Sequence, residues 1–527
     1  MLVYRPLIAV STSLLLSLAI SNQANAENLV YRTRMFSNNK SPDKARKILT
    51  GGKPPVLAQS SSEESGEKNP PPTDINGSAN PLLFPTKPQE TKIDKVKSVT
   101  LDQVVEVALK NNKDLQAARL TLERSQAGLK AASAQRLPTV DAQFDSTYSD
   151  SAAQRISNAI SNAQDPGQDL DVPGQGGGRE STSVTFNGSV GLNYNLYTGG
   201  RVSAEIKRAE GQLKFDQLQV EVIFQKTRFD ATRAYYALQT ADALAAIQQA
   251  RVEDATQTLR DAQLLEQAGL GTRFDVLRAE VELANANQAL TQSIADQRTA
   301  RRRLAQILSI AQDVELTAAD PIREAGNWDM SLDESIVRAY KNRAELEQFL
   351  VQKEINEQNS KIALSQIKPT VSLFLNYNFL DNSDDIVGGE DGYSTGATIQ
   401  WRLFDGGRAS ALAEQANKDV EVDETNFANQ RDLIRLEVEE AYYEMIANKE
   451  NIQTTQKAVE TATESLRLAR LRFQAGVGTQ TDVINSQTEL TTARGNFLRA
   501  IAGYNISLNR LQRAVSNVPD DHLAQFH

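Results

Sequence analysis

The stretch Leu403-Phe404-Asp405-Gly406-Gly407-Arg408 decides the fold, because the hydrophobic period of the chain changes across it. Before it, from Tyr393 to Leu403, alternate side chains fall on two sides, which is the period of two of a half-buried strand. After it, the chain runs without proline and is rich in Ala, Glu, Gln, Leu and Arg, which favour helix. The sequence therefore predicts a joint, with two glycines at the turn, where a strand becomes a helix.

The same joint occurs earlier, at Leu196-Tyr197-Thr198-Gly199-Gly200-Arg201, which is 207 residues before the first. A Gly-x-Gly-Thr turn at Gly269 is repeated at Gly476 with the same offset. Two further matches have an offset of 231 residues: Leu101-Asp102 with Leu332-Asp333, and Pro138 with Pro369. The extra residues fall in the loop of the first hairpin, where insertions are tolerated. The pattern predicts an internally duplicated chain.

Each half is predicted to contain a helix, two strands, a helix of about 68 residues, a tight turn and a shorter helix. The predicted boundaries are as follows: a first repeat over 98–309 with strands at about 139–149 and 183–197, a connection over 310–331, and a second repeat over 332–515 with strands at about 370–380 and 393–404. Residues 150–182 are predicted to form a polar loop, and the first helical pattern runs from Leu101 to Leu137.

The two long helices would each measure roughly 100 Å, which is wider than a globular core. They need lateral partners along their length, and their apolar positions spread over more than one face. This favours helices packed on two sides, as in a wall or tube. An ordinary antiparallel bundle has the same periodicity.

The two ends of the chain are predicted to lie outside this fold. Residues 1–26 resemble a cleaved signal peptide, with Arg5, an apolar core and Ala24-Asn25-Ala26; an N-terminal membrane anchor is the alternative. Residues 27–97 hold nine of the sixteen prolines and are predicted to be a disordered linker. Residues 516–527 are predicted to be a C-terminal tail.

Composition excludes several classes of function. There is no cysteine for a disulfide or thiolate metal site, and no P-loop for nucleotide hydrolysis. The net charge of −10 argues against nucleic acid as a partner. His522 and His527, the only histidines, fall in the tail, where Asp520-Asp521-His522 is either a metal ligand set or solvated chain. We therefore expect no enzyme activity and no cofactor.

No later run of about 18 apolar residues exists, so any membrane crossing would have to use strands. The four predicted strands alternate apolar and polar residues and carry many aromatics, as outer-membrane barrel strands do. A soluble four-stranded sheet would look similar. Four strands cannot close a barrel in lipid, so a barrel requires more than one chain and predicts a ring-shaped homo-oligomer.

Over roughly 99–515, the chain resembles the TolC family of outer-membrane efflux channels. The resemblance rests on the repeat, the hairpins, the Gly-Gly-Arg joints, and the turns Gly269–Asp275 and Gly476–Asp482. It implies a homotrimer, with a twelve-stranded outer-membrane β-barrel that continues into an α-helical periplasmic tunnel. It also implies a periplasmic membrane-fusion adaptor and, through it, an inner-membrane pump, either ABC-type or proton-driven.

The turns at the far end of the tunnel are candidate functional sites. Gly269 and Gly476 suit the left-handed conformation that ends a helix. Thr272-x-x-Asp275 and Thr479-x-x-Asp482 resemble capping boxes, which is the simplest explanation of the two threonines. By the resemblance, these turns, with Gly271 and Gly478, form the gate and the adaptor-docking surface, and the two aspartates face the constriction.

The sequence departs from the best-known member of the family at this gate. A tyrosine and an arginine that hold that channel shut correspond here to Phe473 and Gly478, and Asn485 replaces an acidic residue. The same latch cannot form at these positions. Arg273 is predicted to substitute for it by pairing with Asp275 or Asp482.

At the other end of the tunnel, the strand-to-helix joints are expected at the periplasmic face of the membrane. Arg201 and Arg408 would contact lipid headgroups or a neighbouring chain, or would only begin solvated helices. The function implied is a passive exit duct for tripartite efflux or type I secretion, located in the outer membrane with a long periplasmic portion. The rival interpretation is a periplasmic coiled-coil scaffold or adaptor without a pore.

Overall fold

The computed structural model describes residues 86–164, 182–382 and 388–516 apart from 94 and 312, together with Leu82 and Phe84. All of these belong to one compact unit, Asn69–His527. The predicted signal peptide, most of the predicted linker, residues 165–181 of the predicted loop and the tail after Ser516 lie outside the described residues.

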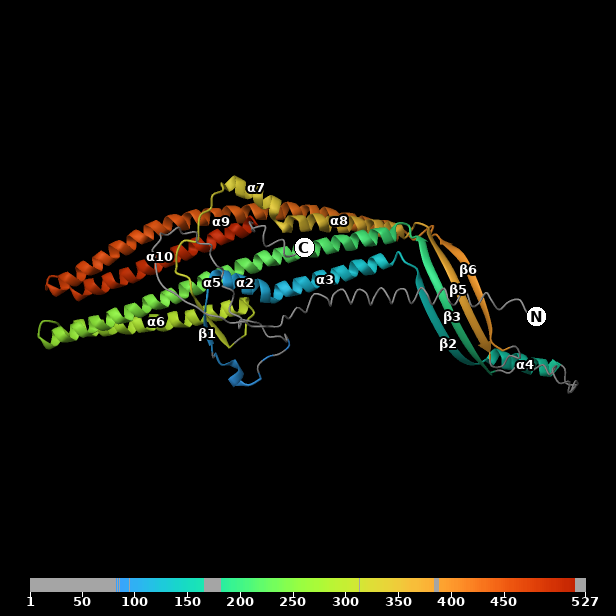
Figure 1. Cartoon of the computed structure of the whole chain (residues 1–527), viewed down its shortest axis with the longest axis horizontal. Helices are drawn as coiled ribbons and strands as arrows, with labels where there is room; N and C mark the ends of the chain where they lie inside the picture. The colour runs from blue at the N-terminus through green and yellow to red at the C-terminus, as the bar shows by residue number, and fades with distance from the viewer. Residues whose placement is uncertain are drawn as a thin grey trace, which may run out of the picture. The chain divides into compact units, whose positions relative to one another are not determined.

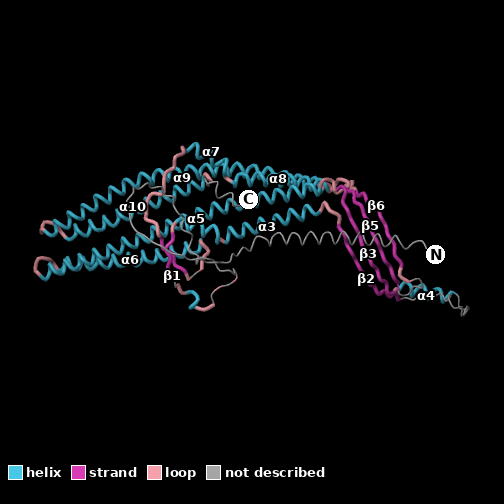
Figure 2. The backbone as a smooth tube through the Cα atoms, in the orientation of Figure 1, coloured by secondary structure: helices cyan, strands magenta, loops and turns pink. Residues whose placement is uncertain are grey.

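The described chain is mainly helical with a small sheet, as the sequence predicts (Figures 1 and 2). The first half contains α2 (Leu101–Asn111), α3 (Lys113–Ala134), β2 (Thr139–Asp150), β3 (Thr182–Tyr197), α5 (Arg201–Gln267) and α6 (Arg273–Ile307). The second half contains α7 (Leu332–Asn342), α8 (Ala344–Ser365), β5 (Thr370–Asn382), β6 (Glu390–Gln400), α9 (Arg408–Gln474) and α10 (Gln480–Ala514). Matching helices of the two halves have equal lengths of 11, 22, 67 and 35 residues.

The long helix α5 packs against neighbours on more than one side, as its spread of apolar positions predicts. It contacts α3 and α8 along one part of its length and α6 and α10 along another, whereas α9 contacts α8 and α10 (Figure 1). The helices therefore lie side by side in the order α3, α5, α8, α9 near the sheet. The order is α6, α5, α10, α9 towards the two helical turns at the opposite end.

Four antiparallel strands form one sheet in the order β2, β3, β5, β6. The register places apolar side chains on one face and polar ones on the other. The apolar face includes Val140, Phe144, Tyr148, Phe186, Val190, Leu192, Leu375, Tyr377, Phe379 and Ile399. The polar face includes Asp141, Gln143, Asp145, Asn187, Asn193, Asn376, Asn378, Ser394 and Thr398.

A second, two-stranded parallel sheet corrects two predicted boundaries. β1 (Lys95–Val99) begins inside the predicted linker 27–97, and β4 (Val314–Ala318) lies inside the connection 310–331 predicted to be irregular. A short 3-10 helix, η1 (Pro88–Thr91), precedes β1. The two strands are distant in sequence, but Val99 and Leu316 become fully buried against α5 once they pair.

Three further differences have local causes. The predicted helix from Leu101 to Leu137 is divided at Asn112, which ends α2 and whose side chain caps α3 by accepting from the Leu115 N–H at 3.0 Å. The predicted loop 150–182 begins with α4 (Ala152–Gln164). β6 ends at Gln400 rather than near 404, because its partner β5 starts opposite, at Thr370, directly after Pro369.

Candidate functional site: the helical turns and the strand-to-helix joints

The first helical turn joins α5 to α6 in the conformation that the sequence predicts. Gly269 has φ 72°, in the left-handed region. Thr272 Oγ1 accepts from the Asp275 N–H at 3.3 Å, and Asp275 Oδ2 accepts from the Thr272 N–H at 3.1 Å. Gly271 is required for space, since a Cβ there would lie 3.0 Å from Leu265 Cβ and 3.1 Å from a backbone nitrogen.

The second turn, between α9 and α10, has the same construction. Gly476 has φ 71°, and Thr479 and Asp482 form a complete capping box with distances of 3.2 and 3.0 Å. The pKa of the Asp482 carboxyl lies below its ordinary value, chiefly because the Thr479 backbone N–H bonds to its charged form. The capping interpretation of both threonines is confirmed, and an aspartate completes the box in each turn.

The pairing predicted for Arg273 is absent from the described chain. Its Nη1 lies 4.0 Å from Glu266 Oε2 instead, and Asp275 and Asp482 each accept from the backbone N–H of their own capping threonine. Phe473 packs into an apolar cluster between α9 and α10, whereas Asn485 is exposed. These positions do not tie the two helix pairs of this chain together.

Three bonds between side chains, which the sequence does not predict, join the pair α5–α6 to the pair α9–α10. Arg278 Nη1 donates to Thr481 Oγ1 at 2.7 Å, near the starts of α6 and α10. Further from the turns, the pair Gln487–Thr258 is bonded at 3.1 Å and the ion pair Arg470–Asp254 at 2.8 Å. The bonded residues are more than 200 positions apart, so no local pattern marks them.

Exposed apolar side chains gather at the first turn and on the start of α6. Leu270, Phe274, Leu277 and Val281 are all largely exposed, and Val477 is the exposed apolar residue of the second turn. The spacing of three and four between Phe274, Leu277 and Val281 is that of a coiled-coil seam. No described helix covers this seam.

At the opposite end of the long helices, both joints use paired glycines in the left-handed region. Gly200 and Gly407, with φ 90° and 86°, directly precede α5 and α9. Asp405 supports the second joint by accepting from the Gly407 and Ala409 N–H groups at 2.9 and 2.7 Å. Arg201 pairs with Glu205 of its own helix, whereas Arg408 is exposed and makes no ion pair or side-chain hydrogen bond within the part of the chain that the structure describes.

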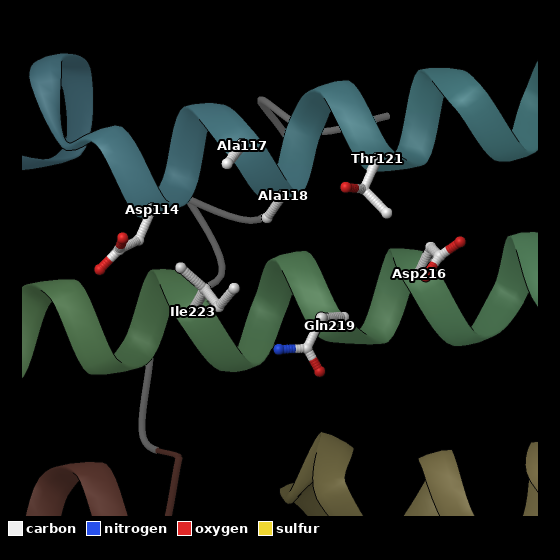
Figure 3. A pocket seen from close by; sticks show the side chains of 7 residues that line it. All are labelled: Asp114, Ala117, Ala118, Thr121, Asp216, Gln219 and Ile223. Atoms are coloured by element: carbon white, nitrogen blue, oxygen red, sulfur yellow. The ribbon is translucent and has the colours of Figure 1, made fainter.

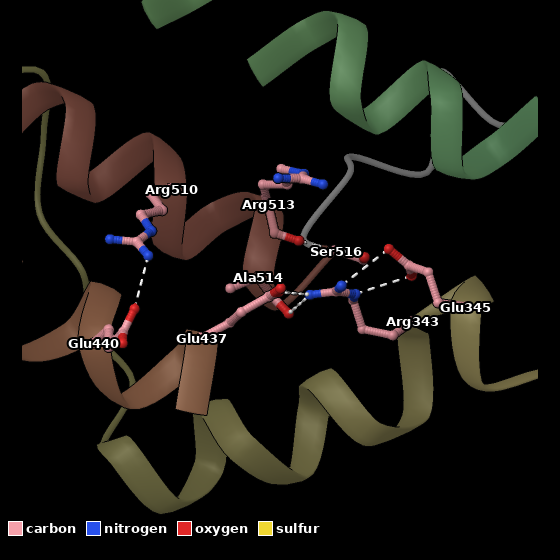
Figure 4. A network of polar contacts seen from close by, with 8 residues as sticks. All are labelled: Arg343, Glu345, Glu437, Glu440, Arg510, Arg513, Ala514 and Ser516. Atoms are coloured by element: carbon pink, nitrogen blue, oxygen red, sulfur yellow. Dashed lines mark hydrogen bonds and ion pairs between the residues drawn. The ribbon is translucent and has the colours of Figure 1, made fainter. Parts of the chain in front are cut away.

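Between the strand-to-helix joints and the helical turns, a buried arginine holds three helices together (Figure 4). Arg343, before α8, makes two bonds of 2.9 Å to Glu345 and one of 2.8 Å to Glu437 of α9. It also donates to the Ala514 carbonyl at the end of α10, at 3.3 Å. Bonds to three helices make this residue a structural clamp.

Among the described residues we find no group of side chains suited to hold a metal ion, and no helix long and apolar enough to span a membrane. The groove in Figure 3 lies between α3 and α5 and measures about 310 Å³. Its lining includes Ala117, Ala118 and Ile223, and its Asp216 already bonds Ser125 and Gln212. We interpret it as a packing groove beside the edge helix α3.

Comparisons with known proteins agree with this architecture. The family model described as outer membrane efflux protein matches residues 104–309 and 335–517. The chain is 23% identical over 350 residues to the outer membrane efflux protein BepC of Brucella suis, covering 65% of this chain and 75% of that protein. It is 24% identical over 333 residues to the protein CyaE of Bordetella pertussis, covering 61% and 70%. The fold is similar to that of the Campylobacter jejuni CmeC outer membrane channel, with a TM-score of 0.69, 15% identity, and coverage of 81% and 88%.

Proposed function

Since the chain belongs to the outer membrane efflux protein family, which groups channels rather than enzymes, we propose that it is a passive exit duct formed by a ring of three identical chains. The ring joins twelve strands in an outer-membrane barrel to a helical periplasmic tunnel. The two halves arose by duplication, with the repeat boundaries given above. The chain is exported by a cleaved signal peptide at 1–26, and a linker connects the mature N-terminus to β1.

The main support for this proposal is that the sheet and the row of helices each have two edges without a partner in the described chain. The sheet ends at β2 on one side and β6 on the other, and the adjoining row of helices ends at α3 and α9. Along α9, Val422, Leu436 and Tyr443 lie at heptad spacing and are exposed. Because the two edges of the chain differ, each edge pairs with the opposite edge of a neighbouring chain. Such head-to-tail pairing, repeated from chain to chain, closes into a ring.

The sheet supports membrane insertion of this ring. Its apolar face would meet lipid and its polar face would line the pore, as in outer-membrane barrels. Trp401, Leu403 and Phe404 follow β6 and are exposed by 61%, 79% and 85%. Such residues suit the lipid boundary, where Arg408 would contact headgroups or the next chain.

The helical turns would then form the closed end of the tunnel. We assign the exposed seam of Phe274, Leu277 and Val281 as the docking surface for a helix of a periplasmic membrane-fusion adaptor, which links the duct to an inner-membrane pump. Opening requires the helix pairs to separate, and therefore breaks the bond between Arg278 and Thr481. Asp275 and Asp482 would add negative charge at the constriction.

Cysteine cross-linking tests the ring directly, because the natural chain has no cysteine. One variant carries Gln143→Cys on β2 together with Ser394→Cys on β6, and a flexible bismaleimide joins them in outer-membrane fractions. A closed ring gives a covalent trimer and no larger species. Each single variant should stay monomeric, because a head-to-tail contact never places identical residues together. Dimers from either single variant would contradict the proposed arrangement.

The class of cargo can be identified from the export process that fails when the gene is deleted. Deletion of the gene is followed by comparison of secreted proteins, exported lipids and sensitivity to small toxic compounds. Loss of secretion alone supports type I secretion, and sensitivity alone supports efflux. The rival interpretation, a periplasmic scaffold without a pore, predicts that the protein is recovered in the soluble periplasmic fraction.

A further inference from the structure

Phe374 is the only aromatic side chain that the strand registers place on the polar face of the described sheet. It lies on β5, opposite Asn193 of β3 and Gly396 of β6. Its near neighbours on this face are amides and hydroxyls, including Asn376 and Ser394. Phe374 therefore presents an aromatic ring among polar groups.

The ring rests on the place where Gly396 has no side chain. A Cβ at Gly396 would lie 2.8, 3.0 and 3.6 Å from Phe374 Cζ, Cε1 and Cε2. The ring therefore covers the backbone of β6, with one side against the sheet. The other side of the ring faces away from the sheet, and Phe374 is partly exposed. Because glycine has no side chain, position 396 leaves room for the ring to lie flat on the sheet, whereas a larger residue would push it away.

Charge on the same face has one sign. Asp141 and Asp145 of β2 point to the polar face, and neither makes an ion pair within the described residues. Asp141 lies in the register row adjacent to that of Phe374. The ranges 139–150, 182–197, 370–382 and 390–400 contain no Lys, Arg or His. The face attracts cations, and no positive side chain on it opposes their approach.

We propose that this face is a transient binding site for aromatic organic cations as they pass through the barrel, with Phe374 as the aromatic contact. This rests on the proposed duct and adds a class of cargo to it. An aromatic ring attracts a cation over its face and stacks with a flat apolar group, while the carboxylates supply long-range attraction. A cation without aromatic groups gains the attraction to the ring face and to the carboxylates, but not the stacking.

The test uses the full-length protein in a planar bilayer in potassium chloride. Tetraphenylphosphonium and tetraethylammonium carry the same charge, and each is added on the barrel side. We expect tetraphenylphosphonium to block the parent current about threefold more tightly. Phe374→Ala should remove this difference, and Phe374→Tyr should keep it. Gly396→Ala should lower the unblocked conductance, because its methyl group displaces the ring into the pore.

Phe144→Ala is a matched control. Phe144 also lies over a glycine, with two ring atoms 3.3 Å from the Cβ position of Gly188, but on the apolar face. Its loss should leave the difference between the two blockers unchanged. A Phe374→Ala channel that still discriminates as the parent does would overturn the inference and leave the duct standing. A parent protein that carries no current would overturn the duct as well.

Discussion

Replacing Arg278 with alanine should raise the open probability of the channel, because its bond to Thr481 joins the N-terminal parts of α6 and α10. The donor is charged, both residues are partly buried, and the distance is 2.7 Å. Such a bond contributes about 1.5 kcal/mol net. Since about 1.4 kcal/mol is a factor of ten, the ratio of closed to open population should fall about tenfold per chain. If three chains open together, the effects multiply up to about a thousandfold.

Single-channel recording in a planar bilayer measures this effect. Thr481→Val removes the acceptor alone, so it should match Arg278→Ala, and the double variant should add little. Arg273→Ala is the control: its contact with Glu266 is 4.0 Å long, its side chain is 63% exposed, and it joins two ends of one turn. The reasoning is refuted if Arg278→Ala has the open probability of the parent, or if Arg273→Ala opens the channel more.

Three further changes test other parts of the structure. Gly271→Ala should destabilise the first turn by about 1–3 kcal/mol through overpacking, seen as faster hydrogen exchange there, whereas Gly128→Ala, with nothing within 4 Å, should not. Arg343→Met should lower the melting temperature, because it leaves two glutamates beside a buried site without their cation. Asp482 has a lowered folded pKa, so its stabilisation is present above its unfolded pKa of about 3.9 and is lost as pH falls through the folded value. The protection of amides at the start of α10, expressed relative to the intrinsic exchange rate at each pH, should therefore fall on acidification, and Thr479→Ala should weaken that dependence.

The features that the sequence predicts well are those with local causes. The helical turns need glycines in the left-handed region and threonine caps, and both signals are contained within a few residues. The strand-to-helix joints are equally local. Asn112 also carried a signal, since asparagine is a strong N-cap, but an uninterrupted helical pattern on both sides concealed it.

Features that depend on distant residues were not predictable in this way. β1 and β4 are short strands that pair across more than 200 residues, so neither is evident alone. The bonds of Arg278 and Arg343 depend on how whole helices are placed against each other. Within the described chain Arg273 lies near Glu266 of α5 rather than Asp275 or Asp482, and its proposed part in closing the gate stays a prediction.

Recording current from the purified full-length protein in a planar bilayer tests the central claim most directly. Protein extracted as a trimer from the outer-membrane fraction should conduct ions in discrete steps. The open probability should rise when Arg278 is replaced. Protein that is recovered in soluble form and carries no current under the same conditions would contradict the account.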